Sequence, residues 1–348
     1  PEAGGGREEG EAKTRTASIM CLVIGFAVLL YSGDCLVRGA LAAAYKSNVS
    51  PLLVGIVIVG FGTSMPEFLI GVQAASSGYS GLAHGNIIGS NIANIFLVLA
   101  LPALIFPITT DAPRMRITAF FMLCCTAAWI GVTMFFGLTQ IVGMIFLVVL
   151  AIYAVIAWMI DREDRTEDTK EEIAIMNTPA WRMVMLILIG LIGLPLGARF
   201  LVDGGITLGK ELNASERIVG LTLLAFGSSL PELGAAIAAS LRKQSDVAMG
   251  NIIGACIFNI LGVGGVVGIL GPRAMVSPEF TAFSNWAMAL AAILVTLVIF
   301  LHRRVGVATG IIFLALYGTY LLGLVNNWSF EGVGDLIIAP AAQTPIAD

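Results

Sequence analysis

Two glutamates, Glu67 and Glu232, have the clearest capacity for chemistry in this 348-residue chain, because each lies within an otherwise apolar stretch. Both stand in the same local sequence, Gly-Thr/Ser-Ser-x-Pro-Glu. A carboxylate at membrane depth costs roughly 3 kcal/mol or more and marks a functional site by default. A helix cap is the alternative, since Ser64-x-x-Glu67 and Ser229-x-x-Glu232 have capping-box spacing. We predict that the motif restarts a broken helix and also directs its acid into a binding site.

A second polar motif begins Gly-Asn-Ile-Ile-Gly and occurs at 85–94 and again at 250–259. Ser90 and Asn94 lie four residues apart and therefore share one face of a helix. Asn259 repeats Asn94 in the second copy. Both asparagines are predicted to point at the site of the glutamates.

The other residues of this motif have structural interpretations. Asn86 and Asn251 are of the residue type that caps helix N-termini. Small residues let membrane helices approach closely, which predicts close packing at Gly85, Gly89, Gly250 and Gly254.

The two motifs together form a set of oxygen ligands without thiolates or imidazoles. Such hard ligands suit Ca²⁺, Na⁺ or Mg²⁺ and not zinc or copper. Two carboxylates neutralise one Ca²⁺, and other cations or protons must replace its charge when it leaves. This balance favours antiport over uniport. The candidate ligands are Glu67, Glu232, Thr63, Ser64, Ser90, Asn94, Ser228, Ser229, Asn259 and the backbone carbonyls near Gly60 and Ala225.

The composition indicates which elements must position these residues. Apolar residues make up 57% of the chain and charged residues 12%, whereas a soluble domain is about a quarter charged. A spanning helix needs about 20 mostly apolar residues. An all-α polytopic membrane protein with ten transmembrane helices is therefore predicted, at 18–44, 51–76, 83–106, 116–136, 138–160, 181–209, 216–241, 247–271, 283–301 and 306–326.

The chain repeats itself at an offset of 165 residues, which brings both polar motifs into register without a gap. Each half then contains five spans, and an odd number means that the halves enter the membrane from opposite sides. Two inverted five-helix repeats are the plan of many secondary transporters, with the substrate site between them. The expected organisation is a flexible polar tail (1–17), a first repeat (18–160), a cytoplasmic linker (161–180), a second repeat (181–326) and a C-terminal tail (327–348).

Charge sets the expected orientation and partners. Lysine and arginine are more frequent in the loops after odd-numbered spans, which places the 161–180 loop in the cytoplasm and both termini outside a cell membrane. A net charge of −4 does not favour a nucleic-acid partner. Asp34 and Arg199 occupy equivalent positions in the first and sixth spans, and they either pair or reach for the membrane surface.

At these motifs the chain resembles the calcium/cation antiporter superfamily, and specifically the sodium/calcium exchanger family in its compact prokaryotic form. The residues that carry the resemblance are GTSMPE (62–67), GNIIGSNIAN (85–94), GSSLPE (227–232) and GNIIGACIFN (250–259). The resemblance implies an ion core formed by spans 2, 3, 7 and 8, across which spans 1 and 6 slide as a slanted pair. It implies that Glu67 and Glu232 bind calcium and that the neighbouring hydroxyls and amides complete calcium and sodium sites.

Several positions depart from the pattern of that family. Ala255 stands where a serine ligand is common, and Asn259 stands where some relatives carry aspartate. Ser228 replaces threonine, Gly60 replaces alanine, and Cys256 replaces asparagine. These changes leave the calcium carboxylates in place and bear on the counter-ion.

The sequence therefore predicts a Ca²⁺/Na⁺ antiporter that works by alternating access, and not an enzyme. We expect no cofactor besides the transported ions, Ca²⁺ and Na⁺, and the lipid bilayer as its surroundings. A Ca²⁺/H⁺ antiporter on the same fold and, less in keeping with the repeat, a cation channel remain alternatives.

Overall fold

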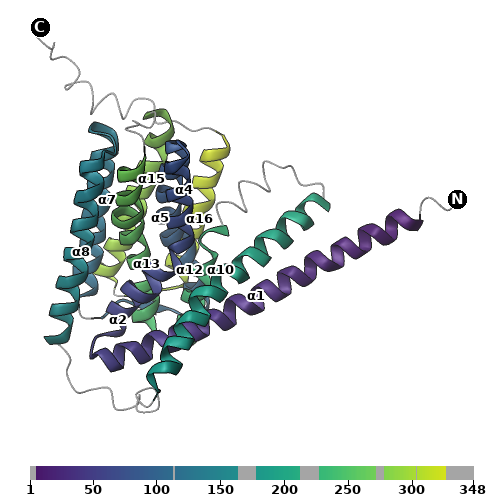
Figure 1. Ribbon diagram of the computed structural model, residues 1–348, viewed down its shortest axis with the longest axis horizontal. Coiled ribbons are helices and arrows are strands. Elements are labelled where there is room, and N and C mark those ends of the chain that lie inside the picture. Colours follow the sequence, from purple (N-terminus) through teal and green to yellow (C-terminus); the bar gives the residue numbers. More distant parts are fainter. Residues whose placement is uncertain are drawn as a thin grey trace, which may run out of the picture.

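The computed structural model describes residues 5–112, 114–163, 178–211, 227–271, 278–302 and 304–326. Its described part is a bundle of helices from which one long pair extends (Figure 1). The first half contains α1 (Gly5–Ser47), α2 (Pro51–Val54), η1 (Gly55–Gly60), α3 (Phe61–Thr63), α4 (Met65–Ser76), α5 (Ser80–Ala93), η2 (Asn94–Val98), α6 (Ala100–Ile105), α7 (Met115–Phe135) and α8 (Gln140–Glu163). The second half contains α10 (Ala180–Glu211), α12 (Leu230–Leu241), α13 (Ser245–Phe258), η4 (Asn259–Val263), α14 (Gly264–Leu270), α15 (Pro278–Leu301) and α16 (Val307–Val325). The η elements are π-helical turns within longer helices.

The described helices are long and apolar enough for a membrane protein. Eight of them could cross a bilayer, and a ninth span results if Pro51–Thr63 and Met65–Ser76 are taken as one helix bent by 46°. Of the expected seventh span, 216–241, only the part covered by Leu230–Leu241 is described as a helix. The polytopic all-helical architecture is thus present, while the count of ten spans stays a prediction.

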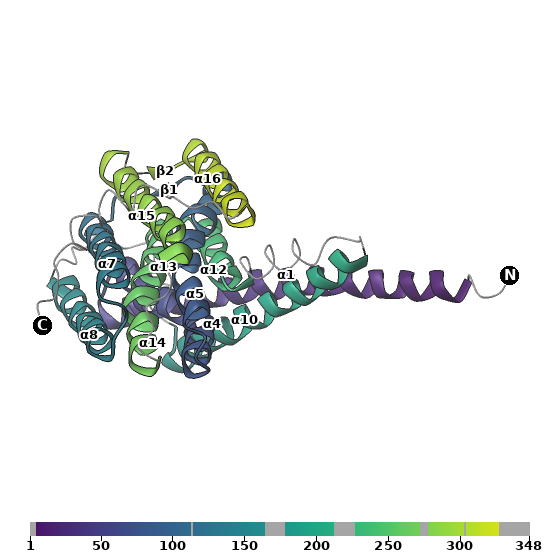
Figure 2. The same cartoon turned by 90° about the horizontal axis from the view of Figure 1, so that it is seen from above.

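Helices α1 and α10 lie side by side and cross the bundle at a slant (Figures 1 and 2). Glycines allow this close approach: a Cβ added to Gly25 would lie 2.9 Å from the carbonyl oxygen of Gly197. Helix α1 begins at Gly5, so it continues into the range that was expected to be a polar tail. Its apolar span runs from Thr16 to Ser47.

Of the two alternatives for Asp34 and Arg199, the pairing with each other is not formed. Asp34 pairs instead with Arg38 on its own helix and with Arg242 after the end of α12. Arg199 pairs with Asp203, one turn further along α10. The register of two crossing helices decides such contacts, and that register is not visible in the sequence.

A contact at one end of the bundle ties the fifth expected span to the second. Ser50 caps α2 by accepting a hydrogen bond from the Leu53 amide at 3.1 Å, and Pro51 occupies the first helical position. The Ser50 hydroxyl in turn donates to Asp161 at 2.8 Å. Asp161 was expected at the start of the linker, but it lies within α8, which ends at Glu163.

The only departure from an all-helical fold in the described residues is a short antiparallel ribbon of β1 (Ile108–Thr109) and β2 (Arg304–Val305). It joins the α6–α7 connection to the α15–α16 connection.

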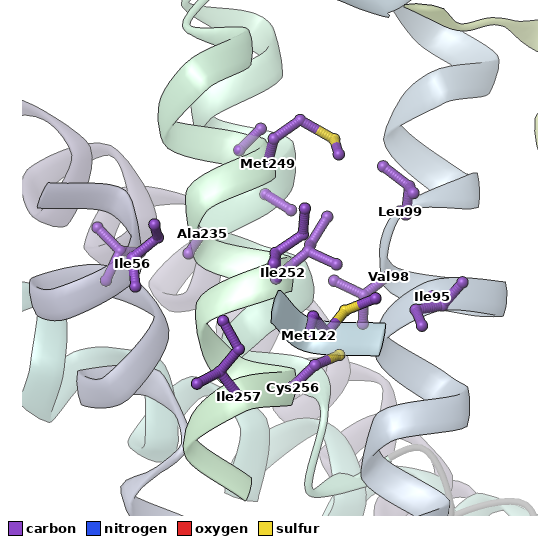
Figure 3. Close-up of a cluster of buried hydrophobic side chains, with 14 of the residues drawn as sticks. Ile56, Ile95, Val98, Leu99, Met122, Ala235, Met249, Ile252, Cys256 and Ile257 are labelled. Atoms are coloured by element: carbon purple, nitrogen blue, oxygen red, sulfur yellow. The ribbon is translucent and has the colours of Figure 1, made fainter. Parts of the chain in front are cut away.

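Helix α13 is the centre of the apolar core. Its side chains Met249, Ile252, Cys256 and Ile257 pack among residues of η1, η2, α7 and α12 (Figure 3). All four are buried. Because α13 is enclosed on all sides, its own polar residues must find partners inside the protein or bind a ligand there.

Elements of the two halves begin at matching positions. Helices α4 and α12 start 165 residues apart, as do α5 and α13 and the π-turns η2 and η4. Asn91 and Cys256 are also equivalent by this offset, and they contact each other, with the Cys256 thiol 4.0 Å from the Asn91 carbonyl oxygen.

Candidate ion-binding site

Both glutamate motifs occur at helix starts. Helix α4 begins directly after Ser64 and α12 directly after Ser229, each with a proline and the glutamate in its first turn. Neither serine makes the side-chain hydrogen bond of a helix cap. In the first half the predicted restart of the helix is present, since α4 follows Pro51–Thr63 at a bend of 46°. In the second half only the helix start after Ser229 lies within the described residues. The capping box is formed in neither motif. The serine hydroxyls are left for other partners.

The two carboxylates are buried, with 1% of Glu67 and none of Glu232 exposed. The Ser64 hydroxyl donates to Oε1 of Glu232 at 3.0 Å, which links the two halves of the chain. Among the described residues, Oε2 of Glu232 and both carboxylate oxygens of Glu67 have no hydrogen-bond partner. A buried carboxylate without a partner is strongly unfavourable. A cation bound between these groups would remove that cost.

Asn94 and Asn259 each begin a π-helical turn. Such wide turns are frequent at functional sites. The turn that starts at Asn94 packs against α12 and α13, and the turn that starts at Asn259 packs against α4 and α5. Each turn thus belongs to one half and also contacts helices of the other. Both amide groups are fully buried and have no partner among the described residues.

Thr63 and Gly60, in the first half, lie next to Asn251 of the second. The Thr63 hydroxyl lies 3.2 Å from Oδ1 of Asn251 and 3.4 Å from the carbonyl oxygen of Gly60. Gly60 is essential to this proximity, since a Cβ there would lie 2.7 Å from the carbonyl oxygen of Asn251. Gly254 makes the reciprocal approach to η1, where an added Cβ would lie 2.6 Å from the Cα of Ile56.

The interpretation of Asn86 and Asn251 as helix caps is wrong, because α5 begins at Ser80 and α13 at Ser245. The Asn86 amide donates to the backbone carbonyl of Glu67 at 2.9 Å, and the Asn251 amide donates to that of Glu232 at 3.0 Å. Each asparagine therefore fixes the turn that carries a glutamate. The sequence contains a signal for this role, because each asparagine follows its glutamate by 19 residues in both halves.

For the remaining predicted site residues within the described ranges, the structure gives burial and position but no hydrogen bond to either glutamate. Ser90 is buried in α5, one turn before Asn94. The Ser229 hydroxyl is buried without a partner among the described residues, and Ser228 is half-buried. Ala225 lies outside the described residues. The predicted close packing is not found at Gly89, where an added Cβ would meet no atom within 4 Å.

The ligand chemistry is that of hard oxygen donors. Within the described ranges, no three histidine, cysteine, aspartate or glutamate side chains gather as a transition-metal centre requires. The available donors are two carboxylates, two amides, hydroxyls and the carbonyl of Gly60. Ca²⁺ takes six to eight oxygen ligands in flexible geometry, and this set can supply them.

The chain matches a known protein family over most of its length. A family model described as sodium/calcium exchanger protein matches residues 17–159 and again residues 182–326. The two matches coincide with the two expected repeats and leave out the charged linker between them.

Individual relatives match over most of their length. The putative antiporter CaxA of Alkalimonas amylolytica is 33% identical over 307 residues, covering 86% of this chain and 96% of the relative. The sodium/calcium exchanger MaX1 of Methanosarcina acetivorans is 24% identical over 322 residues, covering 81% of this chain and 91% of that exchanger.

A solved structure has the same fold. The sodium-calcium exchanger NCX_Mj, studied without Na⁺ and Ca²⁺, superposes with a TM-score of 0.74 and 29% identity, covering 89% of this chain and 98% of that one. A second structure of NCX_Mj, soaked in Na⁺, gives a TM-score of 0.73 at 30% identity, with coverage of 89% and 99%.

Proposed function

This chain belongs to the sodium/calcium exchanger family, and on that premise we propose that it exchanges Ca²⁺ for Na⁺ across a membrane by alternating access. The family consists of membrane cation antiporters and not of enzymes. We propose which ions are exchanged, Ca²⁺ for Na⁺, which residues bind them, and that the site opens to each side of the membrane in turn.

The observation that carries the proposal is the set of unpartnered oxygens around Glu67 and Glu232. Two carboxylates neutralise one Ca²⁺, so the calcium-loaded site has no net charge. When Ca²⁺ leaves, the two acids would remain bare in a medium of low dielectric constant, which is costly. Binding of Na⁺ removes this cost, and the empty site is avoided while the protein changes between its two orientations.

The ligands divide into two groups in this proposal. Glu67 and Glu232 bind Ca²⁺ together with the hydroxyls of Thr63 and Ser64 and the carbonyl of Gly60. The amides of Asn94 and Asn259 and the hydroxyls of Ser90, Ser228 and Ser229 complete the sodium sites, with the carbonyl of Ala225. Na⁺ is also a hard cation, so the same oxygens can serve both ions in turn.

The arrangement of the chain that we propose is ten spans in two inverted repeats. The matching starts of the helices and the contact between Asn91 and Cys256 support it. A residue touches its own equivalent only near a two-fold axis, as in the isologous contacts of dimers. Helices α1 and α10 would slide over the ion core, which consists of spans 2, 3, 7 and 8, and would expose the site to each side of the membrane alternately.

The experiment that tests the counter-ion is calcium flux from proteoliposomes that contain the full chain. We expect calcium efflux to follow an imposed sodium gradient and to be small with sodium absent. Efflux driven by a pH gradient without sodium would instead identify a Ca²⁺/H⁺ antiporter. Calcium flux that needs no exchanged ion would identify a channel.

The proposed orientation places both termini outside and the 161–180 loop in the cytoplasm. Single cysteines in the two segments, on a background without native cysteines, test it with a membrane-impermeant thiol reagent applied to intact cells. Labelling of the 161–180 loop from outside would reverse the assignment.

A further inference from the structure

A groove with a volume of about 340 Å³ is lined by none of the candidate ion ligands. It lies between α2 with η1, α7 and α8 and is lined almost entirely by apolar side chains. Phe121 and Tyr153 stack in it with ring centroids 4.3 Å apart. Several residues that line it, such as Ile117 and Ile152, are largely exposed, so the groove opens toward the surroundings of the bundle.

The groove runs along α8 from Val149 to Asp161. At 1.5 Å per residue this is about 18 Å, close to the roughly 15 Å thickness of one hydrocarbon leaflet. Its polar end, with Arg114 and Asp161, coincides with the start of α7 and the end of α8. A chain lying in the groove would therefore reach from the membrane surface toward its middle.

A polar pocket of about 480 Å³ continues the groove at this end and shares Arg114 and Ile117 with it. Its other lining residues include Thr110, Asp111 and Arg116. Arg116 is exposed and lies over the ring of Phe300, 5.7 Å from its centroid. Arg114 and Arg116 therefore both line this polar end of the groove.

The acidic groups nearby have other functions. Asp161 accepts the Ser50 hydroxyl at the start of α2, and Arg114 lies 3.8 Å from its Oδ1. Asp111 lines the polar pocket and already has an interaction partner. Arg114 pairs with Asp161 and has a further interaction as well, so the exposed Arg116 is the group that matches a phosphate. Basic pockets between membrane helices bind lipid headgroups.

We propose that this groove holds one phospholipid, with an acyl chain along α8 and the phosphate at Arg116. The site depends only on the chain spanning a bilayer, so it is independent of the ions that are exchanged. Because Leu52, Leu53 and Ile56 form one wall, the lipid would pack against the span that also carries Thr63 and Ser64.

Native mass spectrometry of the purified full chain tests this proposal with two probes that share their acyl chains, dioleoyl phosphatidylglycerol and dioleoylglycerol. We expect one phosphatidylglycerol molecule to be retained after the detergent is removed. Retention of dioleoylglycerol should be weaker by about fivefold or more, because one arginine at an anionic lipid contributes on the order of 1 kcal/mol. Equal retention of the two probes would overturn the proposal.

Two variants locate the lipid, each with a matched control. Arg116→Gln should lower retention of phosphatidylglycerol by about fivefold, whereas Arg182→Gln, an exposed arginine on α10, should not. Ile156→Trp should fill the groove, while Ile145→Trp on the same helix should not, although the two residues are similarly exposed at 49% and 53%. Arginines that merely reach for the membrane surface would make each variant behave like its control, and that result would contradict the assigned site.

Discussion

The Ser64 hydroxyl lies 3.0 Å from Glu232 Oε1, so a hydroxyl of the first half holds the carboxylate of the second. The reverse contact is absent from the described residues, where both the Ser229 hydroxyl and the Glu67 carboxylate lack partners. The site is thus asymmetric although its sequence is repeated. Glu232 is held by a hydrogen bond from Ser64, whereas its equivalent in the repeat, Glu67, is held by none among the described residues.

This asymmetry predicts unequal effects of two equivalent substitutions. Ser64→Ala removes a hydrogen bond to a charged group, which contributes about 1.5–3 kcal/mol. We expect the KM for calcium to rise about tenfold or more, which corresponds to that free energy. Ser229→Ala removes no such bond and should raise the KM less. Calcium uptake into proteoliposomes measures both, and equal effects would contradict the asymmetry.

Asn251 is predicted to matter more for stability than its equivalent, Asn86. The Asn251 side chain donates to the Glu232 carbonyl and accepts from Thr63, whereas Asn86 makes only the first kind of bond among the contacts described. Each buried group left unpaired costs about 1–3 kcal/mol. Asn251→Ala should therefore lower the thermal unfolding temperature more than Asn86→Ala. An equal or reversed order would show that the contact with Thr63 adds nothing.

The close approach of α1 and α10 makes a prediction about Gly197. A Cβ there would lie 2.8 Å from the amide nitrogen of Leu29, so Gly197→Ala forces the two helices apart. Overpacking of this kind costs about 1–3 kcal/mol. Gly318→Ala on α16 is the control, because its Cβ would meet no atom within 4 Å. We expect Gly197→Ala to have a lower thermal unfolding temperature and a lower transport rate than Gly318→Ala. Equal unfolding temperatures and transport rates would show that the helix contact is loose.

Asn259→Asp tests which residue decides the counter-ion. A third carboxylate in a buried site needs another cation or proton to balance it. We expect the dependence of exchange on sodium and on pH to change more than the affinity for calcium. Asn94→Asp is the matched variant at the equivalent position of the other half. Sodium and pH dependence that stay the same in Asn259→Asp would refute this role.

The sequence was sufficient for those features that depend on local composition. The apolar stretches and the offset of 165 residues predicted where α4, α5, α12 and α13 occur. The deep position of Glu67 and Glu232 followed from their apolar surroundings.

The sequence could not predict features that depend on the exact start of a helix or on packing between helices. Asn86 is of a residue type that caps helices, yet α5 begins earlier, at Ser80. Ser64 has capping-box spacing, yet its hydroxyl bonds across to Glu232, since a partner from a distant segment competes with the local one. The same holds for Asp34, whose partner, Arg242, is set by how α1 crosses α12.

Calcium exchange by Glu67→Gln and Glu232→Gln tests the central claim most directly. Glutamine keeps the size of the side chain and removes one charge, so either variant leaves a bound Ca²⁺ with uncompensated charge in a buried site. Removal of one member of a buried pair costs about 3–5 kcal/mol, which predicts a loss of exchange of about 100-fold or more. The control is Asp203→Asn, an exposed acid on α10 that pairs with Arg199. With all three variants folded and inserted, a loss confined to the two glutamate variants is the predicted result, and near-normal sodium-dependent calcium flux in either of them would contradict it.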